Sequence, residues 1–147
     1  MNLPQVAEIK ISYHPDKAEK PVMKSSIDAF NFFKGFFMGE TISLQEQFAA
    51  MYLNRANKVL GVTILSKGGV TGTVVDIRLL LSIALKCAAV SILLCHNHPS
   101  GNLKPSKAGE EITNRIKQAA ALFDIILRDH LIITSNSYYS FADEGLL

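Results

Sequence analysis

The sequence lacks a surplus of charge of either sign. Its 147 residues include 15 lysines and arginines against 13 aspartates and glutamates, which gives a formal net charge of +2. Binding to the phosphate backbone of nucleic acids depends on a dense basic surface. The basic clusters here are small, such as Lys17, Lys20 and Lys24, and we interpret them as a solvated face. Direct nucleic-acid binding is therefore not supported by the charge.

Cysteine is also scarce. The two cysteines, Cys87 and Cys95, both lie in apolar segments, where a reduced thiol packs as a small hydrophobic group. The N-terminus, MNLPQVAEIK, does not show the basic region and apolar stretch of a secretory signal. We therefore predict a cytoplasmic protein.

A long apolar run without charge is missing as well. The segment 79–95 approaches the length of a membrane span, but Lys86 lies near its centre. We divide the segment near Ala88 into a helix followed by a buried strand. No contact with a membrane is expected.

The sequence shows no internal repeat, no low-complexity tract and no linker rich in proline or glycine. Hydrophobic residues make up 48% of the chain and charged residues 19%, a composition typical of a compact fold. We predict a single domain over residues 1–147, in which residues 1–40 form an N-terminal strand and helix. Residues 41–147 then form the core that carries the functional motifs.

The spacing of apolar residues and turn formers predicts an α/β fold. Strands are expected over residues 7–13, 47–53, 59–65, 72–75, 90–95, 125–127 and 131–134. Helices are expected over residues 27–33, 77–88 and 106–123, with N-caps at Ser25 or Ser26, at Asp76 and at Ser106. Together these elements predict a mixed, mostly antiparallel sheet flanked by helices.

Two histidines, His96 and His98, follow the predicted strand 90–95 and are separated by one residue. On an extended backbone such residues point to the same side, so both imidazoles can reach one ion, and this geometry suits zinc. A polar loop whose histidines bond only to backbone is the alternative. The turn at 99–101 and the helix start at Ser106 predict a concave polar site at a strand end, which favours the metal site.

The run HNHPSG from His96 to Gly101, followed by Pro105 and Ser106, resembles the JAMM signature of the JAB/MPN metalloproteases in its RadC-type form. Further stretches that resemble the same branch lie in order at residues 46–48, 53–54, 68–70, 76, 78 and 129–132. The resemblance implies an MPN/JAB-like fold of the cytidine-deaminase-like kind and a link to DNA repair. RadC-type proteins of full length usually carry an N-terminal helix-hairpin-helix region, and we expect none here.

The JAMM pattern has a glutamate, then His-x-His, a serine and an aspartate. Glu46, His96, His98 and Ser106 match the first four positions. The resemblance implies that the histidines and the aspartate bind zinc, and that Glu46 is the general base for a zinc-activated water. It also implies that Ser106 hydrogen-bonds to that water or to the tetrahedral intermediate.

The aspartate position is occupied by Gly109, so the third ligand is missing. A site with only two histidines should hold zinc more weakly. Glu110 is the nearest substitute, but each helical residue turns about 100°, so it starts on the wrong side and needs an unwound first turn. Glu111 lies further round, and Cys95 points to the opposite face of its strand.

Several of these residues also have ordinary structural interpretations. Ser106 is a good N-cap whatever its chemistry, and Glu46 can be a solvent-facing residue at a strand start. Asp129 and His130, between two apolar segments, are interpreted as a hydrogen-bonded structural pair rather than a second metal site.

Two functional hypotheses follow. The first is a zinc-dependent metallopeptidase or amide hydrolase whose peptide or amide substrate is unspecified. The second, prompted by Gly109, is a non-catalytic interaction domain or an accessory protein of DNA metabolism. A homodimer or partner protein is expected if Phe33, Phe36 and Phe37 form an exposed patch, although we favour a core position for them. Gly109 can also be a local variant in an active lineage, in which case aspartate restores the site.

Overall fold

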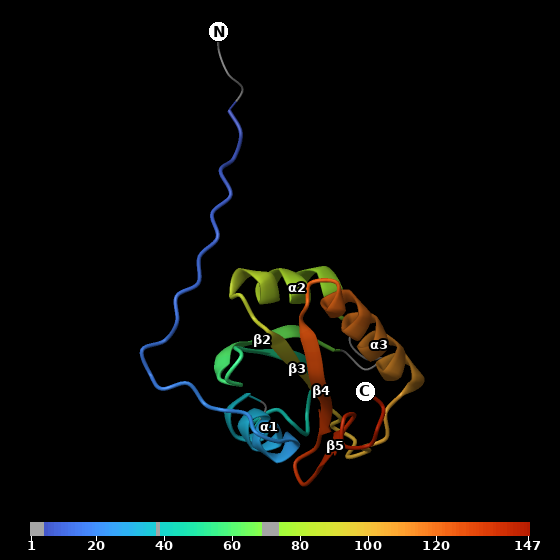
Figure 1. Cartoon of the computed structure of the whole chain (residues 1–147). Coiled ribbons are helices and arrows are strands. Elements are labelled where there is room, and N and C mark those ends of the chain that lie inside the picture. Colours follow the sequence, from blue (N-terminus) through green and yellow to red (C-terminus); the bar gives the residue numbers. More distant parts are fainter. Residues whose placement is uncertain (1–4, 38, 69–73) are drawn as a thin grey trace.

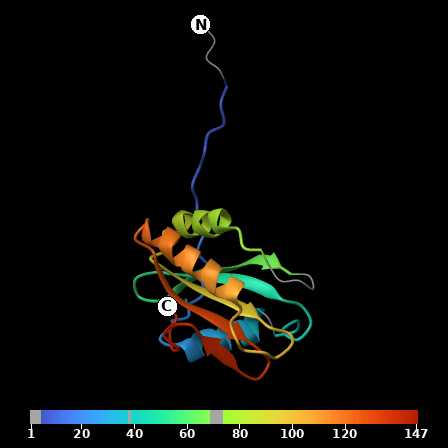
Figure 2. The same cartoon turned by 90° about the vertical axis from the view of Figure 1, so that its right-hand side faces the viewer.

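Figure 1 shows the computed structural model of the chain, which describes residues 5–37, 39–68 and 74–147. The side chains of Phe36 and Phe37 lie outside this description, as do Gly72 and Thr73 of the strand predicted at 72–75. Within the described ranges the chain folds into one five-stranded sheet with helices on both faces, as the two views in Figures 1 and 2 show.

The sheet is mixed, as predicted. Its strands are β1 (Gln47–Leu53), β2 (Val59–Lys67), β3 (Ser91–Asn97), β4 (Ile126–Ile133) and β5 (Tyr138–Ser140), in the spatial order β2-β1-β3-β4-β5. Neighbouring strands are antiparallel except β3 and β4, which are parallel. Parallel neighbours need a long crossover connection, and a helix supplies it between these two strands.

The helices are α1 (Ser26–Phe32), which continues into the π-helical turn η1 (Phe33–Phe37), α2 (Ile77–Lys86) and α3 (Lys107–Ala121). Side chains of β1 and β3 alternate between two core clusters, since Met51 and Leu93 pack with α1 while Tyr52 and Leu94 pack with α2 and α3. The sheet is therefore the middle of three layers. Phe33 is fully buried in the α1 cluster, which matches the preferred interpretation for that residue.

Local sequence accounts for the helix boundaries near the site. Asp76 caps α2 by accepting a hydrogen bond from the Leu79 amide at 3.1 Å. Ala88 adopts a φ of 55°, in the left-handed region where a right-handed helix cannot continue. The chain then enters β3, in which every residue is buried. The predicted division of the apolar segment into helix and central strand is confirmed.

The strand predicted at 7–13 is wrong. These residues form no strand and are exposed, and the segment extends away from the folded body (Figure 1). Val6, Ile9 and Ile11 are 77–89% exposed. Alternation of apolar residues describes a strand that pairs with a neighbouring strand and has a core face. Within this described segment, Tyr13 alone is hydrogen-bonded to the body, through its hydroxyl to the Leu60 carbonyl, and no strand pairing follows. Val74 and Val75, the described end of the strand predicted at 72–75, are likewise not in a strand.

The two short strands predicted at 125–127 and 131–134 form the single strand β4. The polar residues between them stay in the ladder, because Asp129 is paired with Leu93 and His130 with Leu94 on β3. Both polar side chains are buried and hydrogen-bonded, which removes the cost of placing them in the sheet. The short strand β5 was not predicted.

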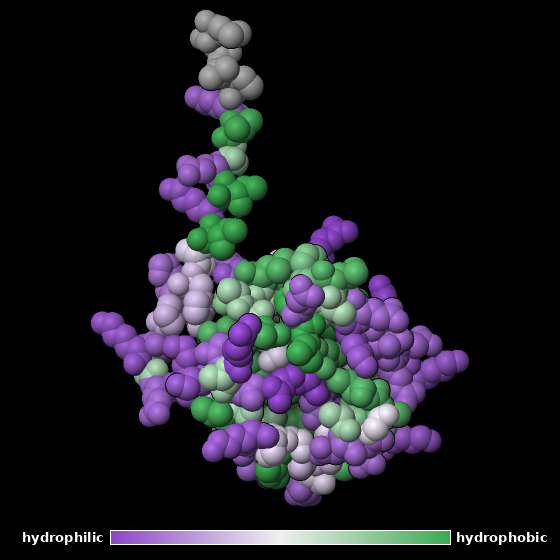
Figure 3. All heavy atoms as spheres, viewed as in Figure 1, coloured by the Kyte–Doolittle hydropathy of each residue, from purple (hydrophilic) through white to green (hydrophobic). Residues whose placement is uncertain are grey.

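Apolar side chains also reach the surface. Leu79 and Leu85 of α2 are about half exposed, and the space-filling view in Figure 3 shows apolar atoms gathered over this helix and along the N-terminal segment. Among the described residues, no helix has the length and apolar character that crossing a membrane requires.

Candidate metal centre

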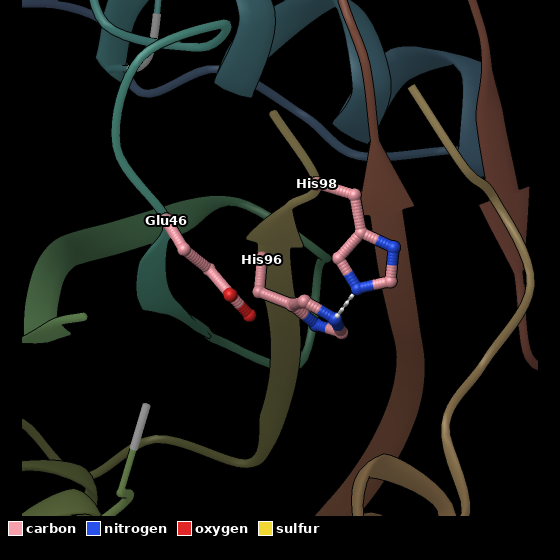
Figure 4. A group of neighbouring side chains, drawn as sticks. All are labelled: Glu46, His96 and His98. Atoms are coloured by element: carbon pink, nitrogen blue, oxygen red, sulfur yellow. Dashed lines mark hydrogen bonds between the residues drawn. The ribbon is translucent and has the colours of Figure 1, made fainter. Parts of the chain in front are cut away.

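The sheet brings three potential metal ligands together at one edge. His96 is near the end of β3, and His98 follows it while still donating its backbone N–H to the Ile133 carbonyl at 3.0 Å. Glu46 directly precedes β1, whose Phe48 is paired with His96 across the antiparallel ladder. One ligand atom each from Glu46, His96 and His98 lie within 4.8 Å of one another, as Figure 4 shows.

Asn97, between the two histidines, holds the glutamate loop against β3. Its side chain is fully buried, and its Oδ1 accepts the Gln47 N–H at 2.7 Å. Its Nδ2 donates to the carbonyls of Ile42 at 2.9 Å and Gln45 at 2.7 Å. Because these bonds flank Glu46 in the sequence, they fix the position of that carboxylate relative to the histidines. This role of Asn97 was not predicted from the sequence.

The His96 ring is buried and neutral. Its side chain is 7% exposed and stacks on Phe48, with centroids 5.9 Å apart and an interplanar angle of 8°. Burial, with a smaller effect from His98 nearby, lowers the pKa of His96 from 6.5 to about 3. A neutral imidazole has one nitrogen with a lone pair, which is the form that binds metal.

His130 continues the hydrogen-bonded string behind His96. Its Nε2 lies 2.7 Å from His96 Nδ1, and its own Nδ1 lies 2.6 Å from Thr113 Oγ1. Burial, and then the neighbouring His96 and His98, lower the pKa of His130 well below its usual value. Phe141 stacks on the ring at a centroid distance of 4.6 Å. This placement suits a residue that orients a metal-binding histidine, a role for His130 that the sequence did not predict.

Asp129 has the structural role that was predicted for the pair. Its carboxylate accepts hydrogen bonds from the Ser140 hydroxyl at 2.6 Å, the Ala142 N–H at 3.0 Å and the His130 backbone N–H at 2.7 Å. The imidazole of His130 is directed to His96 instead. Asp129 therefore ties β4 to the C-terminal segment, while His130 belongs to the surroundings of the metal ligands.

His98 has a defined orientation, with one ring nitrogen directed toward His96. Its Nδ1 lies 2.6 Å from the Asn102 carbonyl oxygen. A carbonyl only accepts, so Nδ1 carries the hydrogen, and a neutral ring then has its lone pair on Nε2. That Nε2 faces His96 Nε2 at 2.9 Å. Two nitrogens that each lie about 2.0–2.1 Å from one zinc ion are at most about 4.2 Å apart, so the pair is close enough to reach one ion.

The α3 side of the site provides fewer ligands. Ser106 is exposed and caps α3, accepting the Gly109 N–H at 3.0 Å, so the predicted N-cap is confirmed. Within the described part of the chain, the one group of potential ligands is Glu46 with the two histidines, and Glu110 does not join it. Glu110 is exposed and lines a separate hollow with Tyr139. Cys95 packs in the opposite core cluster, as expected.

A cleft leads to the ligands from the side of the glutamate loop. It has a volume of about 500 Å³ and is lined by Leu44, Gln45, Glu46, Gly68, His98, Pro99 and Ser100. It therefore joins the carboxylate of Glu46 and the ring of His98 on one solvent-accessible surface, where a small group or an extended chain can approach.

The mixed sheet with helices on both faces, together with the histidine pair at its edge, defines an α/β domain of the JAB/MPN class. A profile of the RadC-like JAB domain matches residues 23–146. The chain belongs to the RadC-like JAB domain family.

Curated relatives agree with this assignment. The UPF0758 protein of Flavobacterium johnsoniae is 48% identical over 122 residues, covering 83% of this chain and 52% of that protein. The UPF0758 protein of Porphyromonas gingivalis is 37% identical over 143 residues, covering 97% of this chain and 63% of that protein. The UPF0758 protein YeeS of Escherichia coli is 43% identical over 103 residues, or 70% of each chain. This chain thus spans between half and two thirds of the first two relatives.

Proposed function

We propose that the chain is a zinc-dependent amide hydrolase of the JAMM type, of the metallopeptidase kind, whose metal site is weakened by Gly109. The observation that carries the proposal is the approach of His96 Nε2 and His98 Nε2 to 2.9 Å beside the Glu46 carboxylate. Family membership supports it, because the JAB class includes metal-dependent hydrolases.

In this proposal His96 and His98 hold the metal, and a bound zinc ion lowers the pKa of a coordinated water toward neutrality. Glu46 takes the proton at its carboxylate. Its distance of at most 4.8 Å from the ring nitrogens suits a base that acts across one water. As the N-cap of α3, the Ser106 oxygen accepts the Gly109 N–H, so the Ser106 hydroxyl hydrogen can still be donated to an oxygen of the substrate. The substrate is a peptide or another amide that enters the cleft beside Glu46.

The second candidate is a non-catalytic interaction domain that acts as an accessory in DNA repair or metabolism, in the cytoplasm. It is favoured by the glycine at position 109, which contributes no ligand, and by the exposed apolar side chains of Val6, Ile9 and Ile11. A second copy of the chain or another protein is the expected partner in this case, because apolar surface favours protein association. The charge of +2 gives no support for direct DNA binding.

Zinc titration of the metal-free protein by calorimetry at neutral pH separates the two candidates. The hydrolase proposal expects one saturable site per chain that is lost in His98→Ala. A library of unstructured peptides, incubated with the zinc-loaded protein and followed by mass spectrometry, then tests turnover. Glu46→Gln is the matched control, because it should keep zinc and lose cleavage. A natural chain without a zinc site would contradict the hydrolase and leave the interaction domain.

A further inference from the structure

A continuous string of polar groups runs from the metal ligands to the first turn of α3. We call it the histidine relay, and its members are His98, His96, His130, Thr113 and the Gly109 carbonyl. Successive contacts are 2.9 Å between the two Nε2 atoms, 2.7 Å from His96 to His130, and 2.6 Å from His130 to Thr113. The Thr113 hydroxyl also lies 2.6 Å from the Gly109 carbonyl oxygen. The relay thus ends at the residue that replaces the expected third ligand.

The rings of His130 and His96 are held in place by aromatic packing. His130 is fully buried and stacked on Phe141 at an interplanar angle of 15°. Phe48 packs against both His130 and His96, with centroids 5.4 Å and 5.9 Å away. Each neutral imidazole carries one ring hydrogen. The positions of the hydrogens, rather than of the rings, are therefore the variable part of the relay.

The first arrangement of hydrogens is closed. Thr113 donates its hydroxyl hydrogen to His130 Nδ1, and His130 Nε2–H then donates to His96 Nδ1. His96 Nε2–H donates in turn to the lone pair of His98 Nε2. Both contacts between the rings are then hydrogen bonds, and the lone pair of His98 that faces the site is used within the protein. The 2.6 Å contact between Thr113 Oγ1 and the Gly109 carbonyl oxygen has no hydrogen in this arrangement.

The second arrangement is open. Thr113 donates to the Gly109 carbonyl, His130 Nδ1–H donates to Thr113 Oγ1, and His96 Nδ1–H donates to His130 Nε2. His96 then has its lone pair on Nε2, facing the lone pair of His98 at 2.9 Å. Two lone pairs at this separation repel each other unless a cation lies between them. Both arrangements hold the same number of protons and differ in the location of two ring hydrogens, which exchange with water.

We propose that Thr113 and His130 are positioning residues that switch His96 between a closed, metal-free arrangement and an open, metal-binding one. The inference rests on the proposed metal site at His96 and His98. In the closed arrangement the facing ring nitrogens are paired by hydrogen bonds without a metal. The open arrangement is the one that could hold zinc, because Thr113 then donates to the Gly109 carbonyl and His96 has its lone pair on Nε2. Partners of this kind in other metal sites change affinity about 10–100-fold when they are removed.

Nitrogen-15 NMR of the histidine rings tests the switch directly. In the metal-free protein the hydrogens of His130 and His96 should lie on Nε2, and saturation with zinc should move the His130 hydrogen to Nδ1. A merely structural His130 would keep one tautomer in both states. Zinc binding without a change of the His130 tautomer would overturn the switch and leave the proposed metal site intact, whereas a chain that binds no zinc at all overturns both.

Thr113→Val and Thr113→Ser provide a second test. Valine removes the acceptor for His130 Nδ1–H, so the open arrangement would bury an unpaired donor. Zinc affinity should fall about 10–100-fold in the valine variant, while the serine variant, which keeps the hydroxyl, should stay near the natural value. Thermal unfolding of both variants shows whether they fold. Equal zinc affinity of the folded valine variant and the natural chain would contradict the proposal.

Discussion

The strand side of the metal centre, at the end of β3 and the start of β1, differs sharply from the helix side at the first turn of α3. On the strand side, His96, Asn97 and the residues beside Glu46 are fixed by buried hydrogen bonds and ring stacking. On the helix side, Ser106 and Glu110 are exposed, and Gly109 contributes only backbone. The comparison shows that the orientation of the two histidines depends on the strand side and not on the side chain at position 109.

The reason is that each side is held in place by its own set of interactions. The sheet fixes the ligands of β3, since the ladder, Asn97 and His130 act on them directly. The helix needs only its cap, because the Ser106 oxygen accepts the Gly109 N–H whether or not residue 109 has a side chain. A glycine at position 109 is therefore compatible with the fold of both elements.

The largest expected effect is a loss of stability caused by a substitution on the strand side. Asn97→Ala removes the partners of one buried N–H and two carbonyls, and buried groups left unpaired cost about 1–3 kcal/mol each without being additive. We expect a loss of about 3 kcal/mol in the free energy of unfolding, measured with chemical denaturant. Asn136→Ala, at an exposed position, is the control and should be near neutral. An Asn97→Ala variant of unchanged stability would show that these three hydrogen bonds are not needed for folding.

Low pH should have the second-largest effect, which is a loss of stability that also arises on the strand side. The pKa of His96 is lowered to about 3, so between about pH 3 and pH 6.5 the unfolded state binds more protons than the folded state. Stability of the metal-free protein should therefore fall as the pH falls below about 6.5, by on the order of 2–3 kcal/mol at about pH 4.5 from His96. Asp129, whose pKa burial raises, acts in the opposite direction.

Denaturant unfolding at a series of pH values measures this loss. His130→Gln removes one of the buried rings and should flatten the profile, because the pKa of His130 is lowered as well. A stability that is constant from neutral pH to about pH 4.5 would mean that the rings are protonated in the folded state.

Repair of the helix side should have a smaller effect, on metal rather than on folding. In Gly109→Asp the new Cβ meets only the Ser106 Oγ at 3.1 Å, within the 4 Å around it, so the side chain fits with a small shift. We expect the zinc affinity to rise at least about tenfold, which corresponds to about 1.4 kcal/mol. Calorimetry beside Gly109→Ala, which adds no ligand, separates coordination from a general effect of the side chain. An unchanged affinity would place the helix side outside the metal site.

Gly109→Ala gives the smallest expected effect. Glycine in a helix costs about 0.5–1 kcal/mol relative to alanine, and part of the gain is lost because the Ser106 Oγ must move slightly from the new Cβ. Thermal unfolding should show a stabilisation of about 0.5 kcal/mol. A loss of stability would mean that the cap of α3 depends on the glycine.

The sequence was sufficient where local rules decide the structure. The caps at Asp76 and Ser106, the continuous apolar run of β3 and the His-x-His spacing all predicted features that the structure has. It was insufficient where residues far apart in the sequence decide the structure. β4 continues through Asp129 and His130 because Ser140 and Thr113 hydrogen-bond to their side chains. Residues 7–13 remain outside the sheet because no strand pairs with them. Asn97, Thr113 and His130 carry polar side chains in buried positions, and a single sequence does not show which groups they meet.

X-ray absorption at the zinc edge of the zinc-loaded natural chain shows which atoms surround the metal. We expect a spectrum with two imidazole ligands and otherwise oxygen donors, and one imidazole or no bound zinc in His98→Ala. A spectrum with sulfur among the ligands, or one that is unchanged by His98→Ala, would contradict the assignment of the metal to His96 and His98.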